Sequence, residues 1–223
     1  MEEKVDFIPY QGIDYSEEEM LKRSQDFYAD MNTRRTVRDF SNKPFPKAVI
    51  ENIILTAGTA PSGANKQPWT FCVISNAEMK SRLRKLAEQE EYMNYNGRMS
   101  ESWLKDLKPL RTDHQKPFID IAPYLIIVFK KVYDFLPNGE RVNNYYVNES
   151  VGLATGMLIA AIHNAGLIAL THTPSPMNFL EKLLERPSNE RAFLHIPVGY
   201  PAEQAKVPDI HRKPLEDITV FYE

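Results

Sequence analysis

Three arginines and a threonine crowd into the five residues Arg34-Arg35-Thr36-Val37-Arg38. Guanidinium groups at spacing i, i+1 and i+4 can surround one small polyanion, because each offers a planar fork of donors that suits phosphate. Taken alone, the stretch is better interpreted as a solvated basic turn in a protein that is acidic as a whole. The sequence on either side has to decide between an anion site and a surface turn.

A second unusual stretch follows, Thr59-Ala60-Pro61-Ser62-Gly63-Ala64-Asn65-Lys66-Gln67-Pro68-Trp69. Its small residues and two prolines predict a stiff loop whose backbone can approach a flat ligand closely. The alternative is an ordinary loop that joins a helix to a strand, but a simple connection does not need so many small and rigid residues. Gly58 and Gly63 have the spacing of a phosphate loop, yet Ala64-Asn65 stands where that loop needs Lys and Ser or Thr.

The composition bounds the class of protein. A chain of 223 residues with a net charge of −3 and a calculated pI near 6.0 fits one domain and argues against nucleic acid as the main partner. The single cysteine, Cys72, allows no intrachain disulfide and suits a reducing compartment. Residues 1–30 lack the apolar stretch of a signal peptide, and the most apolar run, residues 151–162, is too short to cross a bilayer. We expect a cytoplasmic protein with no membrane partner.

Helical and strand patterns alternate along the chain. A capping box, Ser16 followed by Glu19, predicts the start of a first helix. The later helices are expected at residues 46–57, 78–99 and 146–164, and the strands at residues 69–74, 124–129, 167–173 and 193–200. Residues 218–222 are expected to form an edge strand or an arm. The alternation predicts an α/β or α+β fold with one mixed central sheet.

Several common motifs are missing. No G-x-G-x-x-G is present, and the five histidines have neither H-E-x-x-H spacing nor a nearby cysteine, so we expect no metal site. Gly152-x-x-x-Gly156, inside the predicted helix at residues 146–164, is interpreted as a surface that lets another helix approach closely. The C-terminal segment contains Pro201, Pro208 and Pro214 and shows little helical or strand periodicity. Such a segment has to pack against another surface, and in a compact enzyme that surface is often the partner subunit.

The two opening stretches together resemble the FMN-binding signature of the nitroreductase family, R-R-[ST]-x-R followed by A-P-S-[GA]-x-x-x-P-W. From about Arg34 to the C-terminus the chain is most similar to the iodotyrosine deiodinase branch of that family. The segments that carry this closer resemblance are residues 88–95 (EQEEYMNY), 106–112 (DLKPLRT), 197–201 (PVGYP) and 207–214 (VPDIHRKP). Animal members carry an N-terminal membrane anchor that residues 1–33 lack, which implies a soluble form.

The resemblance implies a fold and an activity. The fold would be the nitroreductase α+β type, a mixed central sheet flanked by helices, in a homodimer with an exchanged terminal arm. Residues 1–33 would form an N-terminal helical arm, 88–116 a substrate lid and 201–223 a C-terminal arm of a single FMN-binding domain. The activity would be reductive removal of halogen from a halotyrosine, such as iodotyrosine. No motif identifies the electron source, which would be NAD(P)H or another reductant.

The resemblance also assigns roles to single residues. The cofactor-binding set would hold the phosphate and flavin of FMN: Arg34, Arg35, Thr36, Val37, Arg38, Pro61, Ser62, Gly63, Thr171, His172, Thr173 and Arg212. The catalytic residue would be Thr173, whose hydroxyl would donate to flavin N5. The substrate-binding set would be Ala64, whose N–H meets the phenolate, with Glu91, Tyr95 and Lys116.

The last three residues also make sense from their chemistry. Glu91 and Tyr95 are four residues apart, so on a helix they share one face. A free amino acid needs a carboxylate for its ammonium group, and an ammonium group and a hydroxyl for its carboxylate; Glu91, Lys116 and Tyr95 supply them. Without the resemblance, Glu91 and Tyr95 would be interpreted as part of a solvated helix face and Lys116 as a surface charge.

Two rival interpretations remain open. A general FMN nitroreductase or quinone reductase would share the flavin residues. It would not need Glu91, Tyr95 and Lys116, the zwitterion-binding set that would hold the amino-acid end of the substrate. A flavin-binding protein without turnover, used for storage or sensing, would reduce no acceptor at all.

Overall fold

The computed structural model describes residues 6–223; residues 1–5, the start of the expected N-terminal arm, lie outside the described residues. The chain divides into two units, residues 1–34 and 35–223. Within residues 6–34, the described part of the first unit, the chain forms the helix α1 (Glu17–Thr33), and none of the helix's residues is buried. Ser16 Oγ accepts a hydrogen bond from the Glu19 N–H at 3.2 Å, which confirms the predicted helix start.

The second unit is built on a central sheet whose described strands lie in the order β1-β2-β6-β5. These strands are β1 (Trp69–Ile74), β2 (Tyr124–Lys131), β5 (Ile168–Ala169) and β6 (Glu190–Gly199). Neighbouring strands pair antiparallel, and an isolated parallel bridge joins Thr36 to Ala169. The sheet is therefore mixed only through this bridge.

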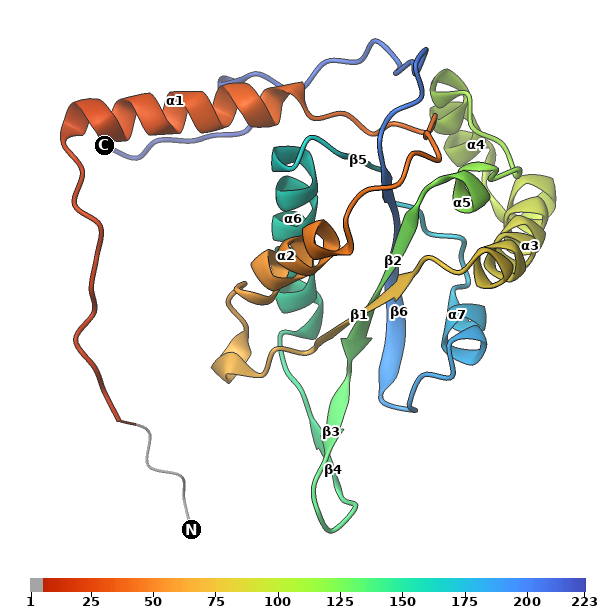
Figure 1. Cartoon of the computed structure of the whole chain (residues 1–223), viewed down its shortest axis with the longest axis horizontal. Helices are drawn as coiled ribbons and strands as arrows, with labels where there is room; N and C mark the ends of the chain where they lie inside the picture. The colour runs from red at the N-terminus through yellow and green to blue at the C-terminus, as the bar shows by residue number, and fades with distance from the viewer. Residues whose placement is uncertain (1–5) are drawn as a thin grey trace. The chain divides into compact units, whose positions relative to one another are not determined.

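Helices cover both faces of the sheet (Figure 1). One face carries α2 (Lys47–Gly58) and α6 (Val147–Asn164), and the other carries α3 (Ala77–Met93), α5 (Phe118–Ile121) and α7 (Asn178–Leu183). The predicted helices at residues 46–57 and 146–164 are confirmed to within a residue at each end. The architecture is that of an α+β fold.

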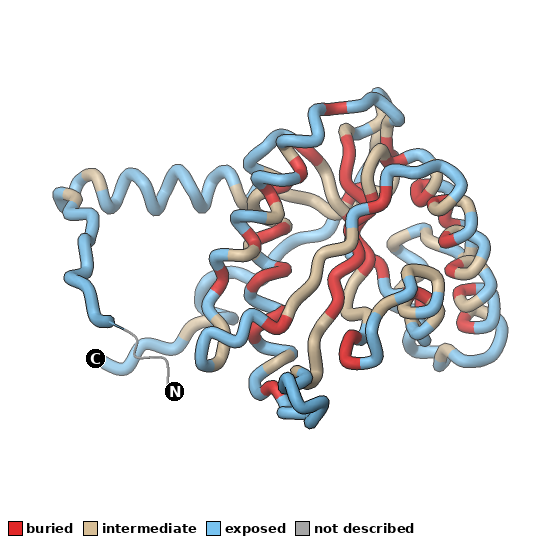
Figure 2. Tube along the Cα trace, turned by 60° about the horizontal axis from the view of Figure 1, so that its bottom comes forward, coloured by how far each residue is buried: buried red, intermediate tan, exposed pale blue. Residues whose placement is uncertain are grey.

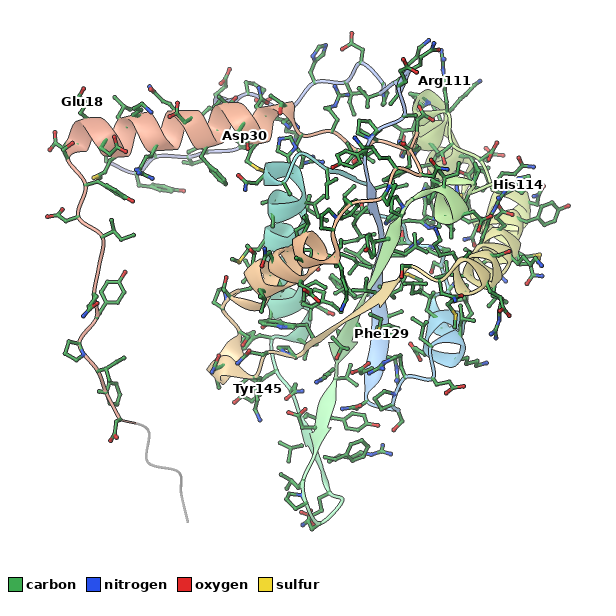
Figure 3. All side chains as sticks on the ribbon, viewed as in Figure 1. Glu18, Asp30, Arg111, His114, Phe129 and Tyr145 are labelled. Atoms are coloured by element: carbon green, nitrogen blue, oxygen red, sulfur yellow. The ribbon has the colours of Figure 1, made fainter. Side chains whose placement is uncertain are left out.

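The sheet forms the core of this unit because side chains on a strand alternate between its two faces. On β2, Leu125, Ile127 and Phe129 pack toward α3, α5 and α7. The intervening Ile126 and Val128 pack toward α2 and α6. All five are fully buried. Figure 2 shows buried residues on the central strands and on the helices that cover them, and Figure 3 labels Phe129 at the sheet. Each such side chain stabilises the fold by about 1.5–3 kcal/mol.

Some predicted elements differ from those observed. The helix predicted at residues 78–99 ends at Met93 and continues as a π-helix, η2 (Asn94–Arg98), in which Gly97 has φ 153°. The strand predicted at residues 167–173 reduces to β5 and a bridge between His172 and His195. Residues 218–222 contain no strand.

The remaining elements lie outside the central layers. They are η1 (Gly63–Asn65), α4 (Glu101–Leu107), η3 (Lys108–Leu110), the hairpin of β3 (Tyr133–Phe135) and β4 (Arg141–Asn143), and η4 (Leu215–Asp217). The segment expected to be a lid, residues 88–116, therefore folds as the end of α3, η2, α4 and η3. No helix in the described part of the chain is long and apolar enough to cross a membrane.

Candidate functional site

A cavity of about 150 Å³ lies where α3 and η2 face the segment that contains α4 and the residues after β5. Its polar lining consists of Arg38, Glu91, Tyr95, Thr112, Lys116, Thr171, His172 and Thr173. Its apolar lining consists of Met99, Trp103, Leu107, Phe118 and Leu170. Arg111 and His114 lie on the same side of this unit as α3 and α4 and belong to the segment that leads from α4 to Lys116 (Figure 3). All three residues of the predicted zwitterion-binding set thus line one cavity.

Glu91 and Lys116 form a buried ion pair in this cavity. Lys116 Nζ lies 3.5 Å from Glu91 Oε2, and the two residues are 4% and 6% exposed. Burial lowers the pKa of the Lys116 ammonium group, while the Glu91 carboxylate acts in the opposite direction. Removing two charges from water is costly unless each finds a partner. The pair supplies one acceptor and one donor of full charge at the same place.

Tyr95 stands beside this pair, one helical turn after Glu91. Its hydroxyl donates to the Thr112 carbonyl at 3.1 Å, and Lys116 Nζ lies 5.5 Å from the centre of its ring. Lys116 Nζ also donates to Thr112 Oγ1 at 3.2 Å and to the Asp113 carbonyl. Residues 112–113 therefore satisfy the polar groups that would otherwise face the cavity unpaired.

A second polar network fixes the main chain of Lys116, and the sequence analysis missed it. The Lys116 N–H donates to Glu88 Oε1 at 2.7 Å. Arg84 in turn donates to Glu88 at 2.7 Å and to Asp120 Oδ2 at 2.8 Å. Glu88 lies three residues before Glu91, so the same helix face holds both the backbone and the side chain of Lys116. The spacing of Glu88 and Glu91 was visible in the sequence, but the hydrogen bond of Glu88 to the Lys116 main chain was not.

Two buried histidines extend the site away from the cavity. His172 Nε2 lies 3.3 Å from Glu91 Oε1, and His172 Nδ1 lies 3.0 Å from His195 Nδ1. Burial lowers the pKa of His172, and it lowers that of His195 further, with His172 adding to the shift. From the sequence, His195 stood out only as one of five histidines, whose spacing does not suit a metal site. Its position inside the predicted strand at residues 193–200, now β6, was the signal in the sequence that this histidine would be buried.

The arginine-rich stretch lies at the β5 edge of the sheet. Thr36 bridges Ala169, Val37 is buried, and Arg38 reaches the cavity. Burial lowers the pKa of Arg38, although an arginine stays charged at any physiological pH. The Arg35 side chain donates to the Pro208 carbonyl. Arg34 is the last residue of the first unit.

The loop at residues 59–69 does not line the cavity. It is tightly bent, since Ala64, Asn65 and Gln67 all have positive φ. The Gly63 N–H lies 3.4 Å from Ser150 Oγ on α6, and a Cβ on Gly63 would lie 3.2 Å from the Tyr146 ring. Pro61, Ser62, Gly63 and Ala64 thus stand at the start of α6, away from the other predicted flavin and substrate residues.

The segment after β5 divides its side chains between two environments. Thr171 and Thr173 are exposed, whereas His172 between them is buried against Glu91 and His195. All three line the cavity. Arg212, the remaining predicted cofactor residue, is exposed on the C-terminal segment.

A larger cavity, of about 520 Å³, shares Arg38 with the first. It is lined by Arg38, Asp39, Pro109, Leu110, Arg111 and residues 206–210. Its walls come from η3 and from the start of the C-terminal segment, which Asp39 holds through hydrogen bonds from the main-chain N–H groups of Ala202 and Lys206. Arg38 therefore stands between a narrow polar cavity and a wide, mixed-charge one.

The α+β sheet and a polar cavity bordered by the arginine-rich segment fit a flavin oxidoreductase, and the comparisons identify the family. Residues 31–200 match the sequence profile of the Nitroreductase family, and the chain belongs to it. Within the family it is similar to iodotyrosine deiodinases. It is 60% identical over 222 residues to that of Haliscomenobacter hydrossis, with the whole of both chains covered. It is 50% identical over 223 residues to that of Danio rerio, covering 99% of this chain and 75% of that one.

A solved structure agrees with this likeness. Iodotyrosine deiodinase bound to FMN and 3-iodo-L-tyrosine matches with a TM-score of 0.74 and 30% identity. The match covers 87% of this chain and all of that one.

Proposed function

We propose that the protein is an FMN-dependent reductive dehalogenase that converts iodotyrosine or a related halotyrosine to tyrosine. The observation that carries the proposal is that the buried Glu91 and Lys116 and the half-buried Tyr95 line one cavity. It is supported by the 60% identity to the iodotyrosine deiodinase of Haliscomenobacter hydrossis and by the likeness to the structure with FMN and 3-iodo-L-tyrosine.

The zwitterion-binding set explains why the substrate is a free amino acid. In the structure Glu91 and Lys116 neutralise each other at 3.5 Å. The ammonium group of the substrate would take the place of Lys116 beside Glu91, while the substrate carboxylate would accept from Lys116 and from Tyr95. Such an exchange keeps every buried charge paired, which a ligand lacking either group cannot do.

The residues at the sheet edge fit FMN. Arg38 is half-buried, and its lowered pKa reflects lost hydration, so an anion beside it would restore a charged partner. Thr36 and Arg35 add donors at the same edge, and the exposed hydroxyls of Thr171 and Thr173 add donors on the cavity wall. Bound FMN, once reduced by NAD(P)H or another reductant, would supply the two electrons that, with one proton, replace the carbon–iodine bond by carbon–hydrogen and release iodide. The protein supplies orientation and charge.

A second copy of the chain would complete the flavin site. Gly152 and Gly156 are exposed on α6, and no atom lies within 4 Å of a Cβ built on either. Leu153 beside them is 53% exposed. Since the loop of Pro61–Ala64 lies at the start of the same helix, pairing α6 with α6 of a partner would bring that loop toward the partner's cavity. The exposed apolar residues of the C-terminal arm, among them Ile218, Val220 and Phe221, would then be covered.

The segment at residues 88–116 would act as the substrate lid. It supplies Glu91, Tyr95 and Lys116, and its apolar Met99, Trp103 and Leu107 line the same cavity. Movement of this segment would admit the substrate and then exclude water from the flavin.

Turnover of the chemically reduced protein without oxygen tests the function. We expect release of iodide and formation of tyrosine when iodotyrosine is added. Reduction of a nitroarene or quinone without iodide release would identify a general nitroreductase or quinone reductase. If no acceptor is reduced, the protein would be a flavin-binding module without turnover.

A substitution on α6 tests the dimer. Gly156→Leu fits one chain without a clash, but it would block close approach of a second helix. We expect a monomer that no longer retains FMN. Gly58→Leu is the matched control, because a Cβ there also meets open space and Gly58 ends α2 rather than facing a partner. An unchanged dimer in Gly156→Leu, measured by analytical ultracentrifugation, would refute the proposed interface.

A further inference from the structure

The two buried histidines are aligned by the main chain. His172 and His195 form an antiparallel bridge, in which each N–H donates to the other's carbonyl at 2.9 and 3.0 Å. Their side chains leave the bridge on the same face of the sheet, and the Nδ1 atoms meet at 3.0 Å. His172 is 8% exposed and His195 is not exposed at all. The Phe118 ring packs edge-on against the His172 ring at 5.4 Å.

The hydrogen bonds allow only one arrangement of protons on two neutral rings. The Glu91 carboxylate only accepts, so His172 Nε2, at 3.3 Å from it, carries the proton. His172 Nδ1 is then an acceptor, and His195 Nδ1 has to donate to it. His195 Nε2 is left unprotonated. This fits its surroundings, since Nε2 of His195 is buried without a hydrogen-bond partner.

We infer that His195 is a positioning residue for substrate recognition: through His172 it fixes which Glu91 oxygen is held and keeps the other one for the ammonium group of the substrate. The chain runs from His195 Nδ1–H to His172 Nδ1 and from His172 Nε2–H to Glu91 Oε1. Glu91 Oε2 is left facing Lys116 and the cavity. The inference rests on the proposed function, because it gives Glu91 its role.

A purely structural role predicts something different. His195 pairs with Ile127 across the sheet, and its Nε2 is buried without a hydrogen-bond partner, so for packing alone a leucine could take its place. His195→Leu should therefore leave the fold intact, at the cost of the hydrogen bond to His172 Nδ1. What the leucine cannot do is donate to His172 Nδ1, so the His172 ring keeps its proton on Nε2, facing the Glu91 carboxylate, but loses the hydrogen bond that fixes its orientation.

Nuclear magnetic resonance of the FMN-loaded protein labelled at the histidine ring nitrogens tests the proton arrangement without any turnover. We expect His172 protonated at Nε2 only and His195 protonated at Nδ1 only. In His195→Leu, His172 should stay protonated at Nε2, but its Nδ1 signal should shift to that of a nitrogen that accepts no hydrogen bond. A wild-type His172 protonated at Nδ1, or at both nitrogens, would overturn the inference.

Binding then tests the consequence. In His195→Leu we expect the dissociation constant of iodotyrosine to rise about three- to tenfold, as the loss of one net hydrogen bond implies, and that of iodophenol to stay unchanged. His195→Asn should restore the affinity, because the asparagine amide nitrogen can occupy the place of Nδ1 and donate. Equal changes for both ligands in His195→Leu, or failure of His195→Asn to restore binding, would overturn the inference.

These outcomes separate from the failure of the proposed function. If wild-type protein bound iodotyrosine no better than iodophenol, the zwitterion-binding set would be refuted and with it the purpose of the histidine chain. The resonance measurement would still report the proton arrangement. If the wild type prefers iodotyrosine and the two histidine variants do not differ, only the role of His195 fails.

Discussion

The substrate end and the flavin end of the site are built in different ways. Glu91, Tyr95 and Lys116 meet in one cavity of one chain, with their charges buried and paired. The residues expected around the flavin are split, since Arg38 and Thr173 line that cavity while Ser62 and Gly63 stand at the start of α6. A single chain therefore holds the whole zwitterion-binding set, whereas the groups expected around the flavin do not meet within it and, in the proposed dimer, would come from two chains.

The largest expected effect lies at the substrate end. Glu91→Gln removes the charge that would pair with the substrate ammonium group, so the dissociation constant of iodotyrosine should rise about a hundredfold or more. FMN affinity and the reduction of a nitroarene should barely change. Glu78→Gln, the same change at an exposed position on α3, is the matched control. A parallel loss of FMN in Glu91→Gln would erase the distinction between the two ends.

The next effect lies at the flavin end. Arg38→Ala removes a charge-assisted contact of about 1.5–3 kcal/mol, which corresponds to a loss of FMN affinity of roughly ten- to a hundredfold. Fluorescence titration of the apoprotein with FMN measures it. Arg82→Ala, at an exposed site on α3, is the control. Full FMN affinity in Arg38→Ala would place the phosphate site elsewhere.

A smaller effect should follow from Tyr95→Phe. The change removes one uncharged hydrogen-bond donor, which donates to the Thr112 carbonyl in the structure. Iodotyrosine should bind about three- to tenfold more weakly, while iodophenol binding should not change. If iodophenol weakened equally, Tyr95 would act on the ring of the ligand or on the shape of the lid.

The smallest effect concerns stability against pH. The pKa values of His172 and His195 are lowered mainly by burial. At His172, the Glu91 carboxylate raises the pKa, while the charges of Lys116 and Arg38 lower it further. Near the ordinary histidine pKa of about 6.5 the unfolded chain therefore binds more protons than the folded one, so stability is constant above it and falls as the pH drops below it.

Urea unfolding between pH 7.5 and 5 measures this slope, with the pH values chosen to bracket about 6.5. His195→Asn removes one of the two groups, so its stability should fall less steeply than that of the wild type, by up to about 1.4 kcal/mol per pH unit. Identical slopes would show that His195 takes up a proton in the folded protein as readily as in the unfolded one.

Much of the fold follows from local patterns in the sequence. The capping box at Ser16, the apolar face of α2 and the dense apolar strands β1 and β2 are each encoded within a few residues, and the structure confirms them. The extent of β5 was wrong because it depends on where β6 offers a partner. Residues 218–222 were expected as a strand or an arm, and no strand forms because no partner pairs with them within the described chain.

The site shows the same division. Glu91 and Tyr95 could be paired from their helical spacing, and Lys116 could be added only through the resemblance to the deiodinases. His195 could not be connected with Glu91, because the link passes through His172 and depends on the bridge between two segments that are 23 residues apart. Glu88 was missed for a similar reason, since its partner is the main-chain N–H of Lys116.

The most direct test of the central claim is a comparison of two ligands on wild-type protein. Iodotyrosine and an iodophenol that lacks the amino-acid end are titrated into the FMN-loaded protein, and the quenching of flavin fluorescence gives each dissociation constant. If Glu91, Tyr95 and Lys116 bind the zwitterion, iodotyrosine binds about a hundredfold more tightly or better. Equal affinity for the two ligands would contradict the assignment and leave a general nitroreductase.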